Sequence, residues 1–461
     1  MKRSFNDEGT QNAAQRHDDL EKRIKELRKR KRREKKLAKN HILRLLPAIL
    51  LILFFTLCLS TSLFTLFSVG GNENYLTLLL PASNISEVED LILKPGQIEE
   101  PDPPAAAAFL MDPETGEELY AKNADQPLPM ASTTKIMTAV VTMENADMNE
   151  SVTISENASS VGESSVWLEA GETLSIEQLL YALLVQSAND AATALAEYVG
   201  GSEEAFVKMM NQKAAELELE NTHFVNPHGL DQEDHYSSAH DLAYTAAYAM
   251  RDQTFADIVV TDGYQIPWPG NPYPRVLENH NRLLQMYPYG TGIKTGYTNN
   301  AGRCLVASAR KDGRELISVI LNCDDYWNQT ISLMNYGFDS FARVEFSYMG
   351  HPLAAVTVGM FPSREVNAVA MSDMILTVRR DRLDACLQAR AYYREWLPYP
   401  VMGGQEVGYM VVGEGGYCEK SAALISDACR LKPNPLVRFF SFVGDVLGLW
   451  WKGIKLIIPG V

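Results

Sequence analysis

Cysteine is scarce in this chain, with 6 among 461 residues, and one of these, Cys58, lies in an apolar run. Domains that are held together by a disulfide framework contain a much larger share of cysteine, so that class is excluded. Cys304 and Cys323 flank an expected hairpin, and Cys418 and Cys429 flank a short loop. Each pair could be bonded or could remain as free thiols, and neither choice defines the fold.

Basic residues are scarce beyond residue 40. Residues 1–40 contain 15 Lys and Arg against 7 Asp and Glu, whereas the rest of the chain contains 27 against 51, a net charge of −24. Binding to nucleic acid depends on Lys and Arg that neutralise phosphates, so we expect no nucleic acid partner for so acidic a body. The basic tail needs another explanation.

Long apolar runs are rare, and the clearest one follows the basic tail. Residues 45–67 are 23 residues without a charge, enough at 1.5 Å per helical residue to cross a hydrocarbon core of about 30 Å. The basic run 28–33 precedes it, which keeps the tail (residues 1–44) in the cytoplasm and places the rest outside. A cleaved signal peptide is the alternative, but its apolar core is shorter. We therefore expect a permanent anchor in the cell membrane.

A second apolar stretch, residues 436–461, carries polar side chains at helical spacing. Arg438, Asp445, Lys452 and Lys455 fall on one narrow stripe of a helix. A transmembrane span would place Asp445 and Lys452 in hydrocarbon, at about 2.5–3.5 kcal/mol each near its centre. We expect an amphipathic helix that lies on the membrane, so that lipid is a partner of both ends of the chain. A helix packed on the protein is the alternative.

Between the apolar stretches the sequence predicts a stalk and two domains. Residues 68–104 end in an acidic, proline-rich run that is too polar and stiff for a core, which predicts a stalk. Residues 105–350 show strand patterns, then helical ones, then antiparallel strands, which predicts an α/β (α+β) domain. The strand-like residues 351–430 predict a smaller C-terminal β domain.

Three short motifs in the larger domain could carry chemistry. Ser132 and Lys135 share one face of an expected helix, where the amine could activate the hydroxyl, although a capping serine beside an exposed lysine is the alternative. Ser187 and Asn189 lie between two helices, where a plain loop is the alternative. Lys294 lies on an apolar strand and could hold a carboxylate, or could merely discourage sheet pairing. All three motifs in this order, behind an export anchor, indicate a serine acyl-transferase.

The sequence around these motifs resembles the low-molecular-mass penicillin-binding proteins that act as serine-type D-alanyl-D-alanine carboxypeptidases. The resemblance extends from residue 105 to 346, with its main matches at Pro129–Thr138, Gln186–Ala192, Asn226–Leu230 and Gly292–Thr298, and it continues at Pro398–Gly408. It implies a β-lactamase/transpeptidase-like antiparallel sheet flanked by helices. It also implies peptidoglycan stem peptides as substrates, β-lactams as inhibitors and no cofactor. Many relatives begin with a cleaved signal, whereas this chain has a long basic tail and an apparent permanent span.

The resemblance assigns roles to individual residues. Ser132 would be the acylated nucleophile, Lys135 its base, and Ser187 the group that passes a proton to the leaving amine. A second buried lysine nearby would lower the pKa of Lys135 and allow it to act as a neutral base.

The same resemblance identifies the residues that would hold the substrate. Asn189 would bind the peptide, and Lys294 and Thr295 would bind the terminal carboxylate. Gly296 completes this strand motif, and the backbone N–H of Tyr297, with that of Ser132, would form the oxyanion hole.

Three alternatives to a carboxypeptidase stay open. A β-lactamase of the commonest class would need a deacylating glutamate, and the segment Glu216–Asn221 is off by one position. An endopeptidase would share the fold and the motifs. A non-catalytic wall-binding surface protein would be expected to have a broken motif, and all three motifs are intact.

Four histidines between residues 221 and 241 suggest a zinc enzyme as a further alternative. They are His223, His228, His235 and His240. Their spacing matches no common zinc motif, and the resemblance accounts for the segment without metal. We therefore expect a structural loop and no metal.

Overall fold

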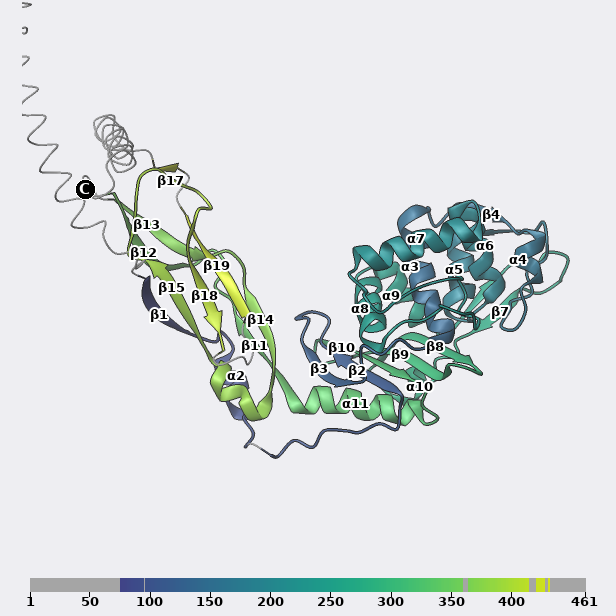
Figure 1. The fold of residues 1–461 in the computed structure, drawn as a ribbon, viewed down its shortest axis with the longest axis horizontal. Coiled ribbons are helices and arrows are strands. Elements are labelled where there is room, and N and C mark those ends of the chain that lie inside the picture. Colours follow the sequence, from purple (N-terminus) through teal and green to yellow (C-terminus); the bar gives the residue numbers. More distant parts are fainter. Residues whose placement is uncertain (1–74, 95, 360–363, 414–419, 428–429, 432–461) are drawn as a thin grey trace, which may run out of the picture. The chain divides into compact units, whose positions relative to one another are not determined.

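The computed structural model describes residues 75–94, 96–359, 364–413, 420–427 and 430–431, and Figure 1 shows its helices and strands. The predicted tail (1–44), membrane span (45–67) and C-terminal helix (436–461) lie outside these residues. Within the described ranges, every helix is too short or too polar to span a bilayer.

A five-stranded antiparallel sheet forms the centre of the larger domain. Its strands are β2 (Ala107–Met111), β3 (Glu118–Lys122), β8 (Gly290–Thr298), β9 (Gly302–Lys311) and β10 (Arg314–Leu321), in the order β3-β2-β10-β9-β8. β2 and β3 come from the start of the domain and the other three from its end. The predicted strands are confirmed, and β8 is an edge strand of the sheet.

Helices cover both faces of this sheet (Figure 1). One layer contains α3 (Lys135–Asn145), α5 (Ile176–Leu184), α6 (Asn189–Gly200), α7 (Glu203–Glu216), α8 (Ala239–Ala249) and α9 (Gln253–Val259), and the opposite face packs against α10 (Leu283–Met286) and α11 (Tyr326–Ser340). Successive residues of a strand point to opposite faces of the sheet and belong to different hydrophobic cores. Phe109 packs with the larger helical layer, and Leu110 packs with Met334 of α11. Because both of their faces are buried, β2 and the central parts of β9 and β10 are apolar runs, whereas the edge strands β3 and β8 contain polar residues and glycine.

Smaller elements lie between the helices of this domain along the chain. They are α4 (Glu156–Ser160), the strand pair β4 (Ser151–Thr153) and β5 (Thr173–Ser175), the hairpin β6 (Gly263–Ile266) and β7 (Arg275–Glu278), and the 3-10 turn η2 (Ala131–Thr134).

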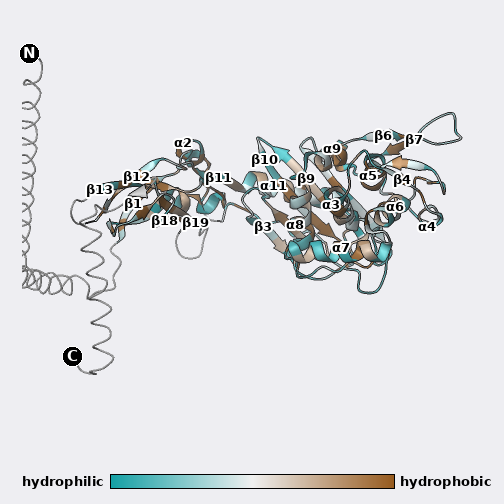
Figure 2. Cartoon of the chain, turned by 90° about the horizontal axis from the view of Figure 1, so that it is seen from above, coloured by the Kyte–Doolittle hydropathy of each residue, from teal (hydrophilic) through white to brown (hydrophobic). Residues whose placement is uncertain are grey.

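Local sequence explains where several helices begin and end. Ser175 and Gln178 form a reciprocal capping box that starts α5, and Ser238 accepts a hydrogen bond from Asp241 N to start α8. After α6 the chain turns at Gly201 with φ +73°, which favours glycine. α7 buries one face only, and Figure 2 shows it in mixed hydrophilic and hydrophobic colours.

The C-terminal domain is β-rich, as predicted. A seven-stranded sheet has the order β1-β15-β18-β19-β13-β12-β16, and β11 pairs with β14 and β17 with β20. The strands are β1 (Tyr75–Pro81), β11 (Phe341–Phe346), β12 (Pro352–Val358), β13 (Arg364–Ala370), β14 (Met374–Arg379), β15 (Gln388–Arg394), β16 (Trp396–Leu397), β17 (Val401–Met402), β18 (Glu406–Val412), β19 (Lys420–Ser426) and β20 (Arg430–Leu431). Short helical turns lie at α2 (Ile85–Val88), η1 (Glu89–Leu91) and η3 (Arg380–Cys386).

The predicted stalk over residues 68–104 is wrong for residues 75–81. This segment is β1, and it pairs with β15 along its whole length, from Tyr75 opposite Arg394 to Pro81 opposite Gln388. The segment therefore forms an edge strand of the β-domain sheet through its backbone and is not part of a stalk. β11 also belongs to the β domain, so this domain begins before residue 351.

Candidate active site

Ser132 lies in the 3-10 turn η2, which leads directly into α3. Lys135 is the first residue of α3, so the predicted helix is confirmed, with a tighter first turn. The Thr134 hydroxyl donates to the carbonyl oxygen of Ala131 at 2.8 Å and braces this turn. From Ala131 to Lys135 only Ser132 is partly exposed, so its hydroxyl is the group that a substrate can reach.

Lys135 is fully buried, and its Nζ contacts three oxygen atoms. Nζ lies 2.9 Å from Ser132 Oγ, 2.7 Å from Asn189 Oδ1 and 2.6 Å from the backbone oxygen of His228. Burial lowers the pKa of Lys135 well below 10.5, and the positive charge of Lys294 lowers it further. The structure thus joins the first two sequence motifs through one amine.

Asn189 and Ser187 come from the connection between α5 and α6. Asn189 begins α6, and its side chain bridges two groups: Oδ1 accepts from Lys135 Nζ, and Nδ2 donates to Gly162 O at 3.0 Å. Ser187, two residues earlier, is buried and has φ +63°, a left-handed conformation that is uncommon for an L residue. This segment is therefore a constrained part of the site and not a plain loop.

The third motif lies on the edge strand β8, next to η2. Lys294 is 2% exposed, and burial lowers its pKa to about 7. Its Nζ donates to the Thr295 carbonyl at 3.1 Å, and the Tyr297 side chain is largely exposed. A Cβ on Gly296 would lie 3.0 Å from Ser132 N, so glycine allows β8 to approach the nucleophile this closely.

The loop Asn226–Leu230 contacts Lys135 in a way that the sequence did not predict. Its contribution is the carbonyl of His228, a backbone atom that carries no residue-specific signal. The Asn226 side chain accepts from the N–H groups of His228 at 3.3 Å and Gly229 at 2.7 Å, which holds the loop in shape. Gly229 has φ +90°, and a Cβ there would collide with the Ala131 carbonyl.

Asp190 is a second residue whose part was missed. Its carboxylate is fully buried beside Asn189 and accepts from the hydroxyl of Ser165 at 2.6 Å and from the N–H groups of Val166 and Leu168 at 3.2 and 3.0 Å. These bonds hold residues 162–168 against the start of α6. The sequence contains a signal for this role, because Asp190 is a charged residue within a run of otherwise uncharged residues that begins a buried helix.

The four histidines of the alternative zinc site have separate partners. His223 Nδ1 contacts the Asp234 carbonyl at 2.6 Å, and His228 Nδ1 accepts from Leu230 N at 3.2 Å. His235 Nδ1 accepts from Val225 N at 3.1 Å, and His240 Nδ1 lies 3.1 Å from Asp241 Oδ1. Burial is the main cause that lowers the pKa of His228 to about 3. Among the residues that the structure describes, no three His, Cys, Asp or Glu side chains are placed to hold a metal ion.

The structure also describes the glutamate and two of the cysteines that the sequence analysis considered. Glu216, from the segment compared with a deacylating glutamate, ends α7 and pairs with Lys213 at 2.7 Å. Cys304 and Cys323 are buried free thiols.

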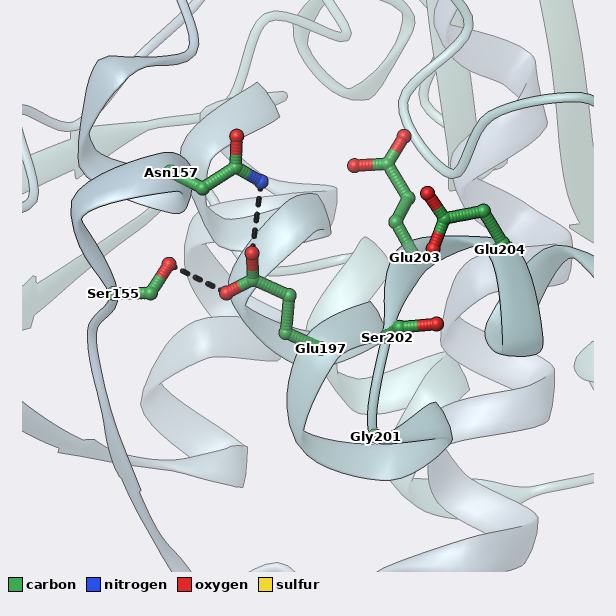
Figure 3. Close-up of a pocket in the computed structure, with 7 residues that line it drawn as sticks. All are labelled: Ser155, Asn157, Glu197, Gly201, Ser202, Glu203 and Glu204. Carbon is green, nitrogen blue, oxygen red and sulfur yellow. Dashed lines mark hydrogen bonds between the residues drawn. The ribbon is translucent and has the colours of Figure 1, made fainter.

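A separate acidic pocket lies where α4 meets the end of α6 and the start of α7 (Figure 3). Its lining includes Glu197, Glu203 and Glu204, and Glu197 accepts hydrogen bonds from Ser155 and Asn157 at 2.5 and 2.8 Å. Burial, followed by the other two carboxylates, raises the pKa of Glu203. None of the predicted site residues lines this pocket.

The chain is similar to known proteins in both sequence and fold. A family model described as D-alanyl-D-alanine carboxypeptidase matches residues 95–325. The chain is 32% identical over 357 residues to D-alanyl-D-alanine carboxypeptidase DacF of Bacillus subtilis, covering 76% of this chain and 90% of that protein. It is 32% identical to DacC of Escherichia coli, covering 68% of this chain and 80% of the relative. The crystal structure of penicillin binding protein 5 from Haemophilus influenzae is similar at a TM-score of 0.64 and 30% identity, covering 72% of this chain and 99% of that one.

Proposed function

Because the chain belongs to the D-alanyl-D-alanine carboxypeptidase family, as a serine-type, penicillin-binding member, we propose that its reaction proceeds through an acyl-enzyme on Ser132. The family implies peptidoglycan peptides as substrates and β-lactams as ligands. Ser132 Oγ attacks the carbonyl carbon of the penultimate D-alanine, the peptide C–N bond breaks, and the terminal D-alanine leaves. Water then hydrolyses the ester and restores the hydroxyl.

The contacts of Lys135 carry this proposal. A neutral amine has two N–H bonds and one lone pair, whereas an ammonium has three N–H bonds. Asn189 Oδ1 and the His228 carbonyl can only accept, so they take the two N–H bonds of the amine. The lone pair then faces Ser132 Oγ and can receive its proton. The lowered pKa of Lys135 favours this neutral form.

The remaining roles follow from position. Ser187 passes the proton to the departing amine, and Asn189 orients the peptide. Lys294 and Thr295 bind the terminal carboxylate, because a buried lysine beside the site offers a strong charge-assisted contact when it is protonated.

The oxyanion hole is proposed between η2 and β8. The backbone N–H groups of Ser132 and Tyr297 would stabilise the developing negative charge of the tetrahedral intermediate. The close approach of Gly296 to Ser132 N supports this placement, since it brings the two backbones together.

Covalent labelling with a fluorescent penicillin tests the nucleophile. Ser132→Ala should abolish both labelling and D-alanine release from a defined pentapeptide while the protein stays folded. Ser160→Ala, at an exposed serine of α4, is the matched control and should label like the parent. Stoichiometric labelling of the Ser132→Ala protein would refute the assignment, and the mass of the product separates carboxypeptidase from endopeptidase activity.

We also propose that the protein is held at the outer face of the cell membrane by both ends. The support is the uncharged run 45–67 behind a basic tail, and the amphipathic pattern of residues 436–461, in which Lys452 and Lys455 can attract anionic lipid.

Sedimentation with anionic vesicles tests the attachment. A chain that begins at residue 70 lacks the predicted span but keeps β1, which the β domain needs. It should sediment with vesicles at low salt and be released at high salt. Removing residues 436–461 as well should abolish sedimentation without loss of carboxypeptidase activity. If the chain that begins at residue 70 does not sediment at low salt, the C-terminal helix is not a membrane contact.

A further inference from the structure

The residue before the nucleophile has an unusual backbone conformation. Ala131 is buried with φ +50°, in the left-handed region that L residues seldom adopt. This conformation sets the direction in which the Ser132 N–H and hydroxyl point. A group that holds Ala131 in place therefore acts on the nucleophile without touching the substrate.

Two neighbours hold the Ala131 carbonyl. Gly229 packs directly against it, and the Thr134 hydroxyl donates to it at 2.8 Å. A hydroxyl has a single proton, so Thr134 must accept in any other hydrogen bond that it makes.

That second bond is to a buried histidine. His235 is 6% exposed, and its Nε2 lies 2.9 Å from Thr134 Oγ1. Because the proton of Thr134 points to Ala131, Nε2 must be the donor. On the other side of the ring, Nδ1 accepts from Val225 N at 3.1 Å, so Nδ1 carries no proton. The hydrogen bonds at Nε2 and at Nδ1 therefore assign the same neutral tautomer of His235, with the hydrogen on Nε2.

We propose that His235 is a positioning residue for acylation, because its Nε2–H orients the Thr134 hydroxyl towards the Ala131 carbonyl and so fixes the turn that presents Ser132. The relay runs from Val225 N–H through His235 and Thr134 to Ala131. The inference rests on the proposed role of Ser132. Burial keeps the imidazole neutral, since it is the main cause that lowers the pKa of His235 to about 4.

The test compares His235→Leu with His235→Gln in the full-length protein. Leucine removes the donor, and we expect the acylation rate with a fluorescent penicillin and kcat for a pentapeptide to fall about tenfold or more, with KM within about twofold, since preorganised donors act on the transition state. Glutamine can place an N–H near Nε2 and should recover most of the loss. His223→Leu is the control, because His223 contacts the Asp234 carbonyl and not the turn, and it should acylate at the parent rate.

A double-mutant comparison separates positioning from general stabilisation. Thr134→Val should show the same loss of kcat, and adding His235→Leu to it should cost little more, because both changes break one relay. The proposal would be overturned if the losses of the two single variants multiplied in the double variant, or if glutamine at position 235 did not restore the rate. It would also be overturned if kcat/KM fell only because KM rose. If His235→Leu does not fold, Thr134→Val against Thr134→Ser decides in the same way. Failure of the proposed nucleophile would instead appear as penicillin labelling of Ser132→Ala.

Discussion

Replacing Lys294 by methionine should make the protein more stable at neutral pH while it removes activity. Lys294 is 2% exposed, and burial lowers its pKa from 10.5 to about 7. Each tenfold change in proton affinity corresponds to about 1.4 kcal/mol, so the destabilisation by this cation is about 4 kcal/mol at pH 7 as an upper limit. Methionine has a similar length and no charge, and it also removes the repulsion that lowers the pKa of Lys135. Both effects act in the same direction.

The lowered pKa of Lys294 determines how the free energy of unfolding should change with pH. The folded protein binds the Lys294 proton more weakly than the unfolded chain, so the unfolded chain carries more protons between about pH 7 and 10.5. The free energy of unfolding of the parent should therefore rise with pH in this window. The variant lacks this contribution, so its advantage should be largest at pH 7 and should shrink towards pH 10.

Urea denaturation of parent and variant at several pH values measures this difference. Lys208→Met is the matched control, because Lys208 is exposed on α7, so its ammonium group is hydrated in both the folded and the unfolded chain. We expect the control to follow the parent at every pH. If Lys294→Met is less stable than the parent at pH 7, or if the difference does not change up to pH 10, then Lys294 is not a destabilising buried cation and the argument fails.

Three further predictions follow from other contacts. Gly296→Ala should slow penicillin acylation about tenfold in a folded protein, because a Cβ would lie 3.0 Å from Ser132 N; an unchanged rate would show that the approach of β8 is not needed. Arg275→Met should lower the free energy of unfolding by about 3–5 kcal/mol, because the buried carboxylate of Glu172, 2.7 Å from Arg275, would lose its charged partner. Adding Glu172→Gln should restore part of this loss. If the changes in free energy of the two substitutions are strictly additive, this account is contradicted. Exhaustive chelation should leave D-alanine release unchanged, since Lys135 takes the proton in the proposed mechanism, whereas activity lost to chelator and restored by zinc would contradict it.

The sequence by itself determined the elements and the motifs of the catalytic domain. Its central strands β2, β9 and β10 contain apolar runs, and its helices begin at residues such as Ser175 and Ser238 that cap the chain locally. These signals act over a few residues, so they can be recognised without knowing the fold. Ser132 and Lys135 form such a local pattern, a hydroxyl near an amine on one helix face, whereas Asn189 and the strand motif at Lys294 are indicated by the order of the three motifs and by the family resemblance.

Only the tertiary structure decided which groups surround the amine of Lys135. The His228 carbonyl is a backbone atom that any residue could supply, and its role depends on a loop that is 93 positions away in the chain. The resemblance implied a low pKa for Lys135, but its causes, burial and the nearby charge of Lys294, are produced by the fold. β1 joined the β domain for a similar reason: the pairing of Tyr75 with Arg394 is set by the sum of many distant contacts, and no local pattern in residues 75–81 records it.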